Sequence, residues 1–234
     1  METKVLERPL IGIPVYKDHE CFLAMIDSLR SSTNWYERII IIESDGDELF
    51  WAQFKVIPNI EIIHAKKEGP LKAYNLLFEI AKKENKDLLI TQTDVIFPRL
   101  YKRDWLQIMN EYANHPKIGI VIPRNGGGIS GPDYIDGYPW AGGWCSYISK
   151  KCWEVFTGYD SNYPMGYGVD IKMTYQISKK YAFAEIDYWV DHHMMNSREH
   201  DNNPNAEQAR KEAGKMFRKE FKLGEFSDDR KKDM

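Results

Sequence analysis

The chain has 234 residues and a formal net charge of -3; 43% of its residues are hydrophobic and 29% are charged. These values are ordinary for a soluble globular protein of one large or two small domains, and the charge gives no electrostatic reason to expect a nucleic-acid-binding protein. No apolar run reaches the ~18 residues of a membrane span, and the N-terminal run is too short for a signal peptide.

In the first half of the chain, apolar runs typical of strands alternate with helical patterns. We expect strands at residues 9–16, 38–44, 60–65 and 87–92. The first helix between them has apolar residues at i, i+3, i+4 and i+7, namely Phe22, Met25, Ile26 and Leu29. A short helix at 49–54 and a longer one at 69–83 follow, the longer with Tyr74, Leu77, Phe78 and Ala81 on one face. This order predicts an α/β fold with a parallel, doubly wound sheet through about residue 97.

Three polar stretches, residues 16–18, 43–47 and 92–94, follow expected strands. Because ligands of such sheets sit outside the carboxyl ends of the strands, we expect these stretches to converge on one binding site. Asp94 lies between two apolar runs, and a carboxylate there is costly to desolvate unless a positive or hydrogen-bonding group meets it.

The second half of the chain is less regular. We expect helices at 100–114, 150–156, 169–181 and 204–222, and strands at 118–123, 145–149 and 182–190, the last ending at His192 and His193. The glycine- and aromatic-rich stretch 124–144 is not expected to form regular structure, and a loop of this length is usually functional. Residues 226–234 are expected to be disordered.

Several common sites are absent from the sequence. No GxGxxG follows the first strand, which disfavours a dinucleotide-binding oxidoreductase, and there is no GxxxxGK[ST] phosphate loop. The acidic stretch 43–48 has too short a ligand series for a calcium loop. The three cysteines, Cys21, Cys145 and Cys152, lack metal-ligand spacing and are odd in number, so we expect no disulfide framework and infer a reducing cytoplasm.

Five motifs occur in an order that resembles a known enzyme family. They are IGIPVYKDHECFLAMIDSLRS followed by IIIIESDGD, GPLKAYN, TQTDV, AGGWCSYISKKCWEVFTGYDSNYPMGYGVDIKM, and VDHHMMNS. Each is weak alone, but together they resemble the GT-A glycosyltransferases, especially the inverting family-two group. The resemblance implies a GT-A domain over residues 1–202, with a nucleotide-binding half at 8–97 and an acceptor half at 98–202. An amphipathic helix and a charged tail would follow at 203–234.

The resemblance also implies a metal and a base. Asp94 matches the last acidic position of the family's DxD motif and would bind Mn²⁺ or Mg²⁺ with His192, or with the adjacent His193. Asp170 matches the base that takes the proton of the acceptor hydroxyl. Two plainer interpretations remain: Asp94 could cap the following turn, and Asp170 could be only a carboxylate favoured by a helix N-terminus.

The resemblance assigns a further group of residues to the donor. Pro14, Tyr16, Glu43 and Asp45 would contact the nucleoside, although Glu43 could equally be a solvated charge at a strand end. The remaining candidates for the diphosphate and sugar are Gly69, Lys72, Gln92, Thr93, Gly142, Gly143, Trp144 and, on charge alone, Arg198. The loops at 125–144 and 158–168 would bind the acceptor, with Tyr138, Trp140 and Trp144 stacking on sugars or packing beneath the loop.

Three residues depart from the family pattern: Gln92 stands at the first DxD position, Val169 precedes the base, and Lys172 replaces an aspartate. We therefore predict an inverting, metal-dependent transferase that uses a UDP- or GDP-linked sugar and a glycan or lipid-linked acceptor. The alternatives are a nucleotide-sugar-binding protein without activity and a nucleotidyltransferase, although the latter would need a glycine-rich basic loop at 15–20. The last helix could rest on the inner face of a membrane, or pack on the domain or on a second subunit.

Overall fold

The computed structural model describes residues 6–16, 18–65, 70–99, 103–125, 133–135, 138–163, 169–192 and 205–221. The strands are β1 (Leu10–Val15), β2 (Arg38–Glu43), β3 (Ile60–His64), β4 (Leu88–Thr91), β5 (Val95–Ile96), β6 (Ile118–Asn125), β7 (Asp133–Ile135), β8 (Tyr138–Trp140), β9 (Cys145–Ile148) and β10 (Ala182–His192). The helices are α1 (His19–Ser32), α2 (Glu48–Ala52), α3 (Pro70–Glu84), α4 (Trp105–Ala113), α5 (Val169–Ser178), α7 (Ala206–Phe221) and the 3₁₀ helix η1 (Lys150–Glu154).

Eight strands form one sheet in the order β3-β2-β1-β4-β9-β6-β10-β5, and β7 pairs with β8 in a separate hairpin. The four strands β3, β2, β1 and β4 are parallel, as the alternation of strands and helices predicts. β9 runs antiparallel to both β4 and β6, whereas β6 and β10 are parallel. The mostly parallel sheet confirms the predicted α/β class.

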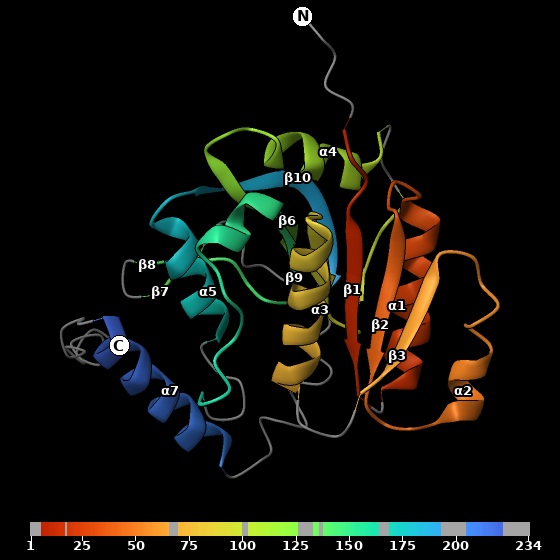
Figure 1. Ribbon diagram of the computed structural model, residues 1–234, viewed down its shortest axis with the longest axis horizontal. Coiled ribbons are helices and arrows are strands. Elements are labelled where there is room, and N and C mark those ends of the chain that lie inside the picture. The colour runs from red at the N-terminus through yellow and green to blue at the C-terminus, as the bar shows by residue number, and fades with distance from the viewer. Residues whose placement is uncertain are drawn as a thin grey trace, which may run out of the picture.

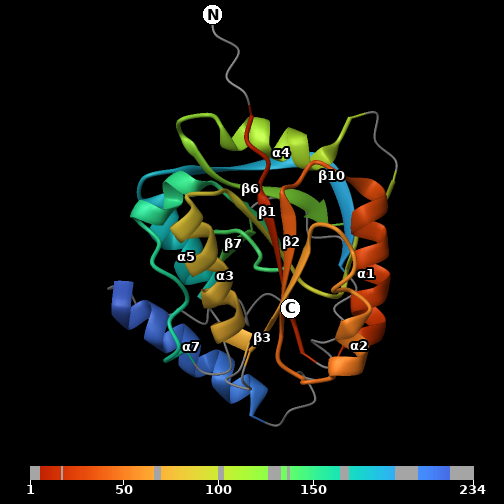
Figure 2. The same cartoon turned by 45° about the vertical axis from the view of Figure 1, so that its right-hand side comes forward.

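The sheet separates two hydrophobic cores, and helices cover both of its faces. Alternate residues of the strands face opposite sides, so Leu10 and Ile40 join one core while Ile11 and Ile39 join the other. The first core packs against α3, η1, α5 and α7, and the second against α1, α2 and α4 (Figures 1 and 2). α3 approaches β1 closely, because a Cβ on Gly12 would come within 2.9 Å of the Leu77 methyl groups. The apolar positions predicted for α1 and α3 are all buried.

The C-terminal helix α7 packs on the domain. Ala213 and Phe217 are 2% and 8% exposed and belong to the first core. The Phe217 ring meets the Tyr175 ring of α5 edge-on, with the centroids 5.8 Å apart. The sequence left open whether this helix rests on a membrane, on its own domain or on a second subunit. The structure shows it packed on its own domain. No helix within the described ranges is long and apolar enough to cross a bilayer.

Three expectations from the sequence need correction. α4 begins at Trp105 instead of about residue 100, because the Asp104 carboxylate caps the helix by accepting hydrogen bonds from the Leu106 and Gln107 N–H groups. The stretch 124–144 is not wholly irregular, since β6 extends to Asn125 and the β7–β8 hairpin lies within it. The short strand β5 was not expected. All three cysteines are free, as predicted, and residues 226–234 lie outside the described residues.

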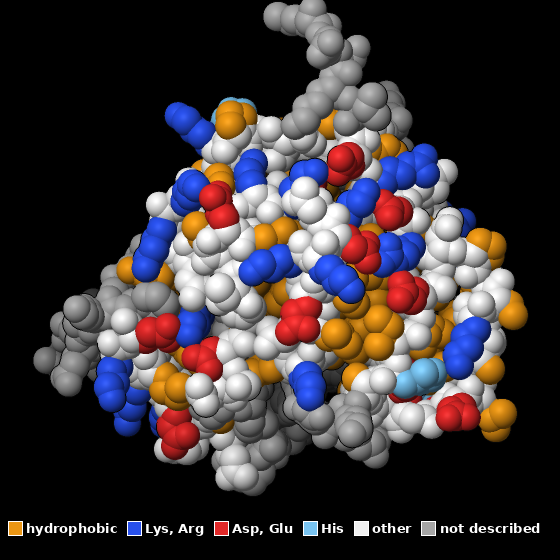
Figure 3. Space-filling view, in the orientation of Figure 1, with side chains coloured by type: hydrophobic (Ala, Val, Ile, Leu, Met, Phe, Trp, Pro, Cys, Tyr) orange, Lys and Arg blue, Asp and Glu red, His pale blue; other side chains and the backbone are white. Residues whose placement is uncertain are grey.

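The surface in Figure 3 carries interspersed charges. Lys and Arg side chains alternate with Asp and Glu side chains across this face, and neither sign forms a continuous field.

Candidate active site

Strand β5 and the end of β10 bring distant parts of the chain together beyond the carboxyl end of β4. The two strands pair antiparallel, with His192 opposite Val95. Asp94 directly precedes Val95, so the pairing places its carboxylate beside the His192 ring, with Oδ2 3.4 Å from Nε2. The two residues predicted as metal ligands are therefore neighbours.

Both side chains are buried but incompletely hydrogen-bonded. Asp94 and His192 are 4% and 10% exposed. Asp94 Oδ1 and His192 Nδ1 are buried and have no hydrogen-bond partner within the described residues. The Trp144 ring stacks on His192 at a centroid distance of 5.3 Å and holds its plane. Because a buried carboxylate oxygen without a donor is costly, Asp94 is suited to a positively charged ligand.

The pair fits a divalent cation that is shared with a substrate phosphate. Within the described ranges, no group of three or more His, Cys, Asp or Glu side chains could hold a metal ion. Mg²⁺ and Mn²⁺ can be held by one or two protein groups together with phosphate oxygens and water. Neighbouring ligands of an ion at a bond length of about 2.1 Å lie about 3 Å apart. The 3.4 Å between Asp94 Oδ2 and His192 Nε2 is close to that spacing.

The two residues before Asp94 are held by neighbouring side chains. Gln92 Nε2 donates to the Tyr74 hydroxyl at 3.2 Å, and the Gln92 N–H donates to the Trp144 carbonyl at 2.9 Å. The Thr93 hydroxyl donates to the Asp18 carboxylate at 3.0 Å. These contacts orient the turn that carries Asp94, while direct contact of Gln92 or Thr93 with a donor stays a prediction.

Cys21 lies beside the Asp18 carboxylate, which accepts the hydrogen bond of the Thr93 hydroxyl. Burial, followed by the hydrogen bond with Asp18, raises the pKa of its thiol to about 11.

Asp170 lies in the first turn of α5, as predicted. A Cβ built on Gly143 would stand 3.3 Å from Asp170 Cβ and 3.8 Å from its Oδ2, so the carboxylate lies against the glycine backbone. Burial, with smaller effects from the charges of Asp94 and Asp170, raises the pKa of Tyr74 to about 12. Gly143, which Asp170 lies against, directly precedes Trp144, whose ring stacks on His192, so Asp170 lies near the Asp94–His192 pair.

The two glycines before Trp144 allow close approach of the backbone. A Cβ on Gly142 would lie 2.2 Å from Trp144 Nε1, so the indole ring can fold over this position only because it is glycine. Trp144 is partly buried against the second core, in agreement with the packing role weighed from the sequence. Its stack on His192 gives it a second role in shaping the site.

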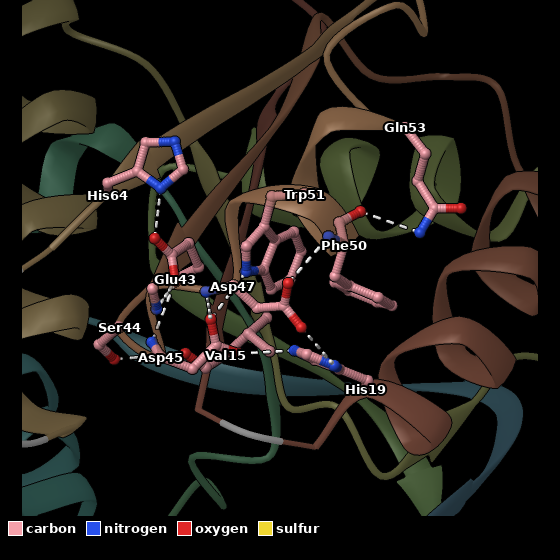
Figure 4. Close-up of polar contacts among 11 residues, drawn as sticks. Val15, His19, Glu43, Ser44, Asp45, Asp47, Phe50, Trp51, Gln53 and His64 are labelled. Atoms are coloured by element: carbon pink, nitrogen blue, oxygen red, sulfur yellow. Dashed lines mark hydrogen bonds and ion pairs between the residues drawn. The ribbon is translucent and has the colours of Figure 1, made fainter.

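Glu43 and Asp45, predicted to contact the nucleoside, are buried within their own loop (Figure 4). Glu43 is 1% exposed, which rules out the solvated-charge interpretation; its Oε2 accepts from the Asp45 and Gly46 N–H groups at 3.0 and 2.9 Å, and its Oε1 meets His64 Nδ1. Asp45 Oδ2 lies 2.6 Å from His19 Nε2. Contact of these two carboxylates with a nucleoside stays a prediction.

Asp45 also accepts hydrogen bonds from the Asp47 N–H at 3.0 Å and from Trp51 Nε1 at 2.9 Å. Burial by itself raises the pKa of Asp45, but hydrogen bonds led by that of the Asp47 N–H outweigh it and hold the pKa well below its ordinary value. The carboxylate is therefore ionised and fixes the loop between β2 and α2.

The other predicted residues are only partly described. Pro14 is half-buried at the end of β1, Tyr16 is 55% exposed beyond it, and Lys72 is exposed on the first turn of α3. Outside the described residues, or with side chains that are not described, are Gly69, His193, Arg198, Tyr138, Trp140 and most of the two acceptor loops.

Reasoning from the sequence missed three residues that shape this edge of the sheet. His64 and His19 each pair with a buried carboxylate, and His19 also stacks on Phe50 at a centroid distance of 3.7 Å. Asn75 bonds to both the N–H and the carbonyl of Tyr159, at 2.6 and 2.8 Å, and so ties α3 to the loop before α5. The asparagine that ends the GPLKAYN motif was the available signal for this last contact.

The arrangement of strands and helices matches known structures of one class. A mannosyltransferase from Pyrobaculum calidifontis in complex with GDP-Man and Mn²⁺ aligns with 83% of this chain at a TM-score of 0.60 and 15% identity. GalNAc-T7 with UDP, GalNAc and Mn²⁺ aligns with 81% at a TM-score of 0.62 and 12% identity. The fold is therefore that of the GT-A glycosyltransferases.

The GT-A likeness extends further along the chain in a third structure. Glucosyl-3-phosphoglycerate synthase from Mycobacterium tuberculosis, in complex with Mn²⁺, UDP and phosphoglyceric acid, aligns with 93% of this chain and 80% of its own length, at a TM-score of 0.59 and 13% identity. The chain spans 59% of the mannosyltransferase and 44% of GalNAc-T7. The sequence matches no protein-family model and no curated protein sequence.

Proposed function

We propose that this GT-A protein transfers a sugar from a nucleotide-diphosphate sugar to an acceptor hydroxyl, with inversion and with the help of a divalent cation. The observation that carries the proposal is Asp94 Oδ1, which is buried beside His192 and has no hydrogen-bond partner among the residues that the structure describes. A carboxylate in this state is explained by a cation that a substrate brings or shares.

Asp94 and His192 would hold Mn²⁺ or Mg²⁺. The cation would supply positive charge to balance the negative charge that develops on the leaving diphosphate. Trp144 keeps the His192 ring in place, and the contacts of Gln92 and Thr93 keep the Asp94 turn in place. Structures of this fold that contain GDP-Man, or UDP, with Mn²⁺ support this class of donor and cofactor.

Asp170 would act as the general base. An inverting transfer needs one carboxylate that takes the proton of the acceptor hydroxyl as its oxygen attacks the anomeric carbon. The position of Asp170 in the first turn of α5, where the helix dipole favours the ionised form, supports this role.

A glycan or a lipid-linked sugar is the acceptor class that we propose, following the family resemblance. The plainest alternative is a GT-A protein that binds a nucleotide sugar without transferring it. Gln92 favours this alternative, because the amide at the first DxD position brings no charge to the metal site.

A panel of UDP- and GDP-linked sugars tests the proposal. With Mn²⁺, the protein should slowly hydrolyse at least one donor in the absence of acceptor, and chelation of the metal should abolish the release. The anomeric configuration of the product, read by NMR immediately after transfer or hydrolysis, should be inverted. A protein that binds UDP or GDP but releases no sugar from any donor would instead be a binding protein, and a retained configuration would exclude an inverting mechanism.

A further inference from the structure

A side chain of α3 holds the backbone of Tyr159 from two sides. Asn75 Oδ1 accepts a hydrogen bond from the Tyr159 N–H at 2.6 Å, and Asn75 Nδ2 donates to the Tyr159 carbonyl at 2.8 Å. The preceding residue, Gly158, has a φ of +123°, and a Cβ there would stand 2.9 Å from Asn75 Oδ1. Glycine suits both this backbone conformation and so close an approach. The loop before α5 is therefore fixed to α3 at Tyr159.

The ring of Tyr159 is fixed as firmly as its backbone. Tyr159 is 7% exposed, and its ring packs against those of Tyr74 and Phe78 at centroid distances of 5.3 and 5.0 Å. Its hydroxyl lies near the candidate base. A Cβ built on Gly143 would stand 3.6 Å from the Tyr159 hydroxyl oxygen and 3.8 Å from Asp170 Oδ2, so the two polar groups flank the same backbone position.

The Tyr159 hydroxyl makes no hydrogen bond to the residues that the structure describes, among which Tyr159 bonds only through its backbone to Asn75. A buried tyrosine hydroxyl usually has a partner. Burial, followed by electrostatic interaction with Tyr74 and Asp170, raises the pKa of Tyr159 well above its ordinary value, so the phenol keeps its proton at neutral pH. The hydroxyl can therefore donate one hydrogen bond to a ligand and accept others from it.

We propose that Tyr159 is a specificity-determining residue, whose hydroxyl binds a second hydroxyl of the acceptor next to the one that Asp170 deprotonates. This inference rests on the proposed function and specifies its acceptor. Sugar rings and other polyols carry two adjacent hydroxyls, whereas a serine side chain or a simple alcohol has only one. An acceptor with a single hydroxyl leaves the buried Tyr159 hydroxyl without a partner, and a site built around a hydrogen bond discriminates against such a ligand.

Alcoholysis of the donor tests the inference with two small probes, ethylene glycol and propanol. They are similar in size, because the second hydroxyl of the glycol is a methyl group in propanol. The full chain is incubated with Mn²⁺, the UDP- or GDP-linked sugar that it hydrolyses and equal concentrations of both probes, and mass spectrometry measures the two glycosides. We expect the glycol product to exceed the propanol product at least about tenfold, as one hydrogen bond allows. Equal yields, or hydrolysis of the donor without either glycoside, would overturn the inference.

Two substitutions test the hydroxyl and the group that holds it. Tyr159→Phe removes only the hydroxyl, so the preference for the glycol should fall about tenfold while UDP or GDP binding stays within about twofold of the wild type. Asn75→Ala should also lower the preference. The double variant should fall no further than Tyr159→Phe alone, because Asn75 acts through Tyr159; an additive fall would show that Asn75 acts elsewhere.

Tyr181→Phe is the matched control. The Tyr181 hydroxyl bonds to Glu154, and Tyr181 directly precedes β10, at the end of that strand opposite to His192. This variant should keep the preference of the wild type.

The ratio of two products formed in one reaction does not depend on the fraction of folded protein, so partial unfolding of a variant does not blur the result. If the wild type prefers the glycol and Tyr159→Phe keeps that preference, the inference is wrong while the proposed function stands. If the wild type releases no sugar from any UDP- or GDP-linked donor, the proposed function itself fails.

Discussion

The proposed mechanism gives the carboxylates of Asp170 and Asp94 different tasks. Asp94 is buried beside His192, and Asp170 lies at a helix N-terminus against the Gly143 backbone. The first would act on the donor through a cation, and the second on the acceptor hydroxyl. A substitution should therefore separate binding from transfer.

Asp170→Asn should keep nucleotide binding within about twofold of the wild type and reduce the transfer rate at least about 100-fold, because only the proton acceptor is lost. Calorimetry with UDP or GDP and a donor-release assay measure the two effects. Asp27→Asn, on the exposed side of α1, is the control and should behave as the wild type does. Loss of nucleotide binding together with transfer would show that Asp170 is structural or contacts the donor.

Asp45 should make the protein sensitive to acid. Its folded-state pKa lies below the unfolded value of about 3.9, so its stabilising effect is complete above pH 4 and is lost as the pH falls through the folded-state pKa. Asp45→Asn should lower the free energy of unfolding by about 1–3 kcal/mol at pH 7. The difference from the wild type should shrink at pH 3, as urea unfolding at the two pH values would show.

Asp47→Asn is the matched control for this experiment. Its side chain is 48% exposed and caps α2 by accepting from the Phe50 N–H, and asparagine caps a helix about as well as aspartate does. The control should stay within about 0.5 kcal/mol of the wild type. A pH-independent difference for Asp45→Asn would contradict the assignment of its shifted pKa.

The helices α5 and α7 are joined by an ion cluster close to the candidate base. Lys172 Nζ lies 3.0 Å from Asp160 Oδ2 and 2.8 Å from Glu220 Oε1. The Lys172 side chain is 10% exposed; burial lowers its pKa, but the bonds to Glu220 and Asp160 outweigh burial and raise it. This lysine, a departure from the family pattern, therefore attaches α7 to the domain and is not directed to a diphosphate.

Lys172→Met should lower the free energy of unfolding by about 2–4 kcal/mol, because it leaves two carboxylates without their cation at a largely buried position. Glu220→Gln should cost at most about 1 kcal/mol, since Glu220 is 39% exposed and Asp160 still pairs with the lysine. Urea unfolding of both variants and of the double variant gives the coupling energy. A coupling near zero would show that the cluster does not hold α7.

The elements with strong sequence patterns were predictable, and the very short ones were not. Long apolar runs predicted the strands β1, β2 and β4, and regular apolar spacing predicted the buried faces of α1 and α3. A two-residue strand such as β5 is too short to show a periodic pattern. It forms because it pairs with β10, which is distant in the sequence. The β7–β8 hairpin is equally short and lies in a glycine-rich stretch.

The sequence predicted candidate residues for the site but not the contacts among them. The motif order indicated Asp94, His192 and Asp170, and the fold brings the first two within 3.4 Å. The burial of Glu43 and its contact with His64 could not be read from the sequence, because both depend on a neighbour in the adjacent strand. Cross-strand register, which the sequence does not state, places His64 beside Glu43.

The whole molecule combines a GT-A sheet with a candidate cation site that the described side chains leave incomplete. Four parallel strands lie in the first half of the chain, the second half adds His192 and Asp170, and an ion cluster attaches α7 to α5. In this arrangement, the two proposed metal ligands come from different halves of the chain. Binding of nucleotide and of cation should therefore be coupled.

Calorimetric titration of the wild type with UDP and GDP, with and without Mn²⁺, measures this coupling most directly. We predict that Mn²⁺ tightens the binding of at least one of the two nucleotides about tenfold or more, and that Asp94→Asn removes the gain while Asp27→Asn keeps it. Nucleotide binding that is absent, or that is equally strong without Mn²⁺ and unchanged in Asp94→Asn, would contradict the account.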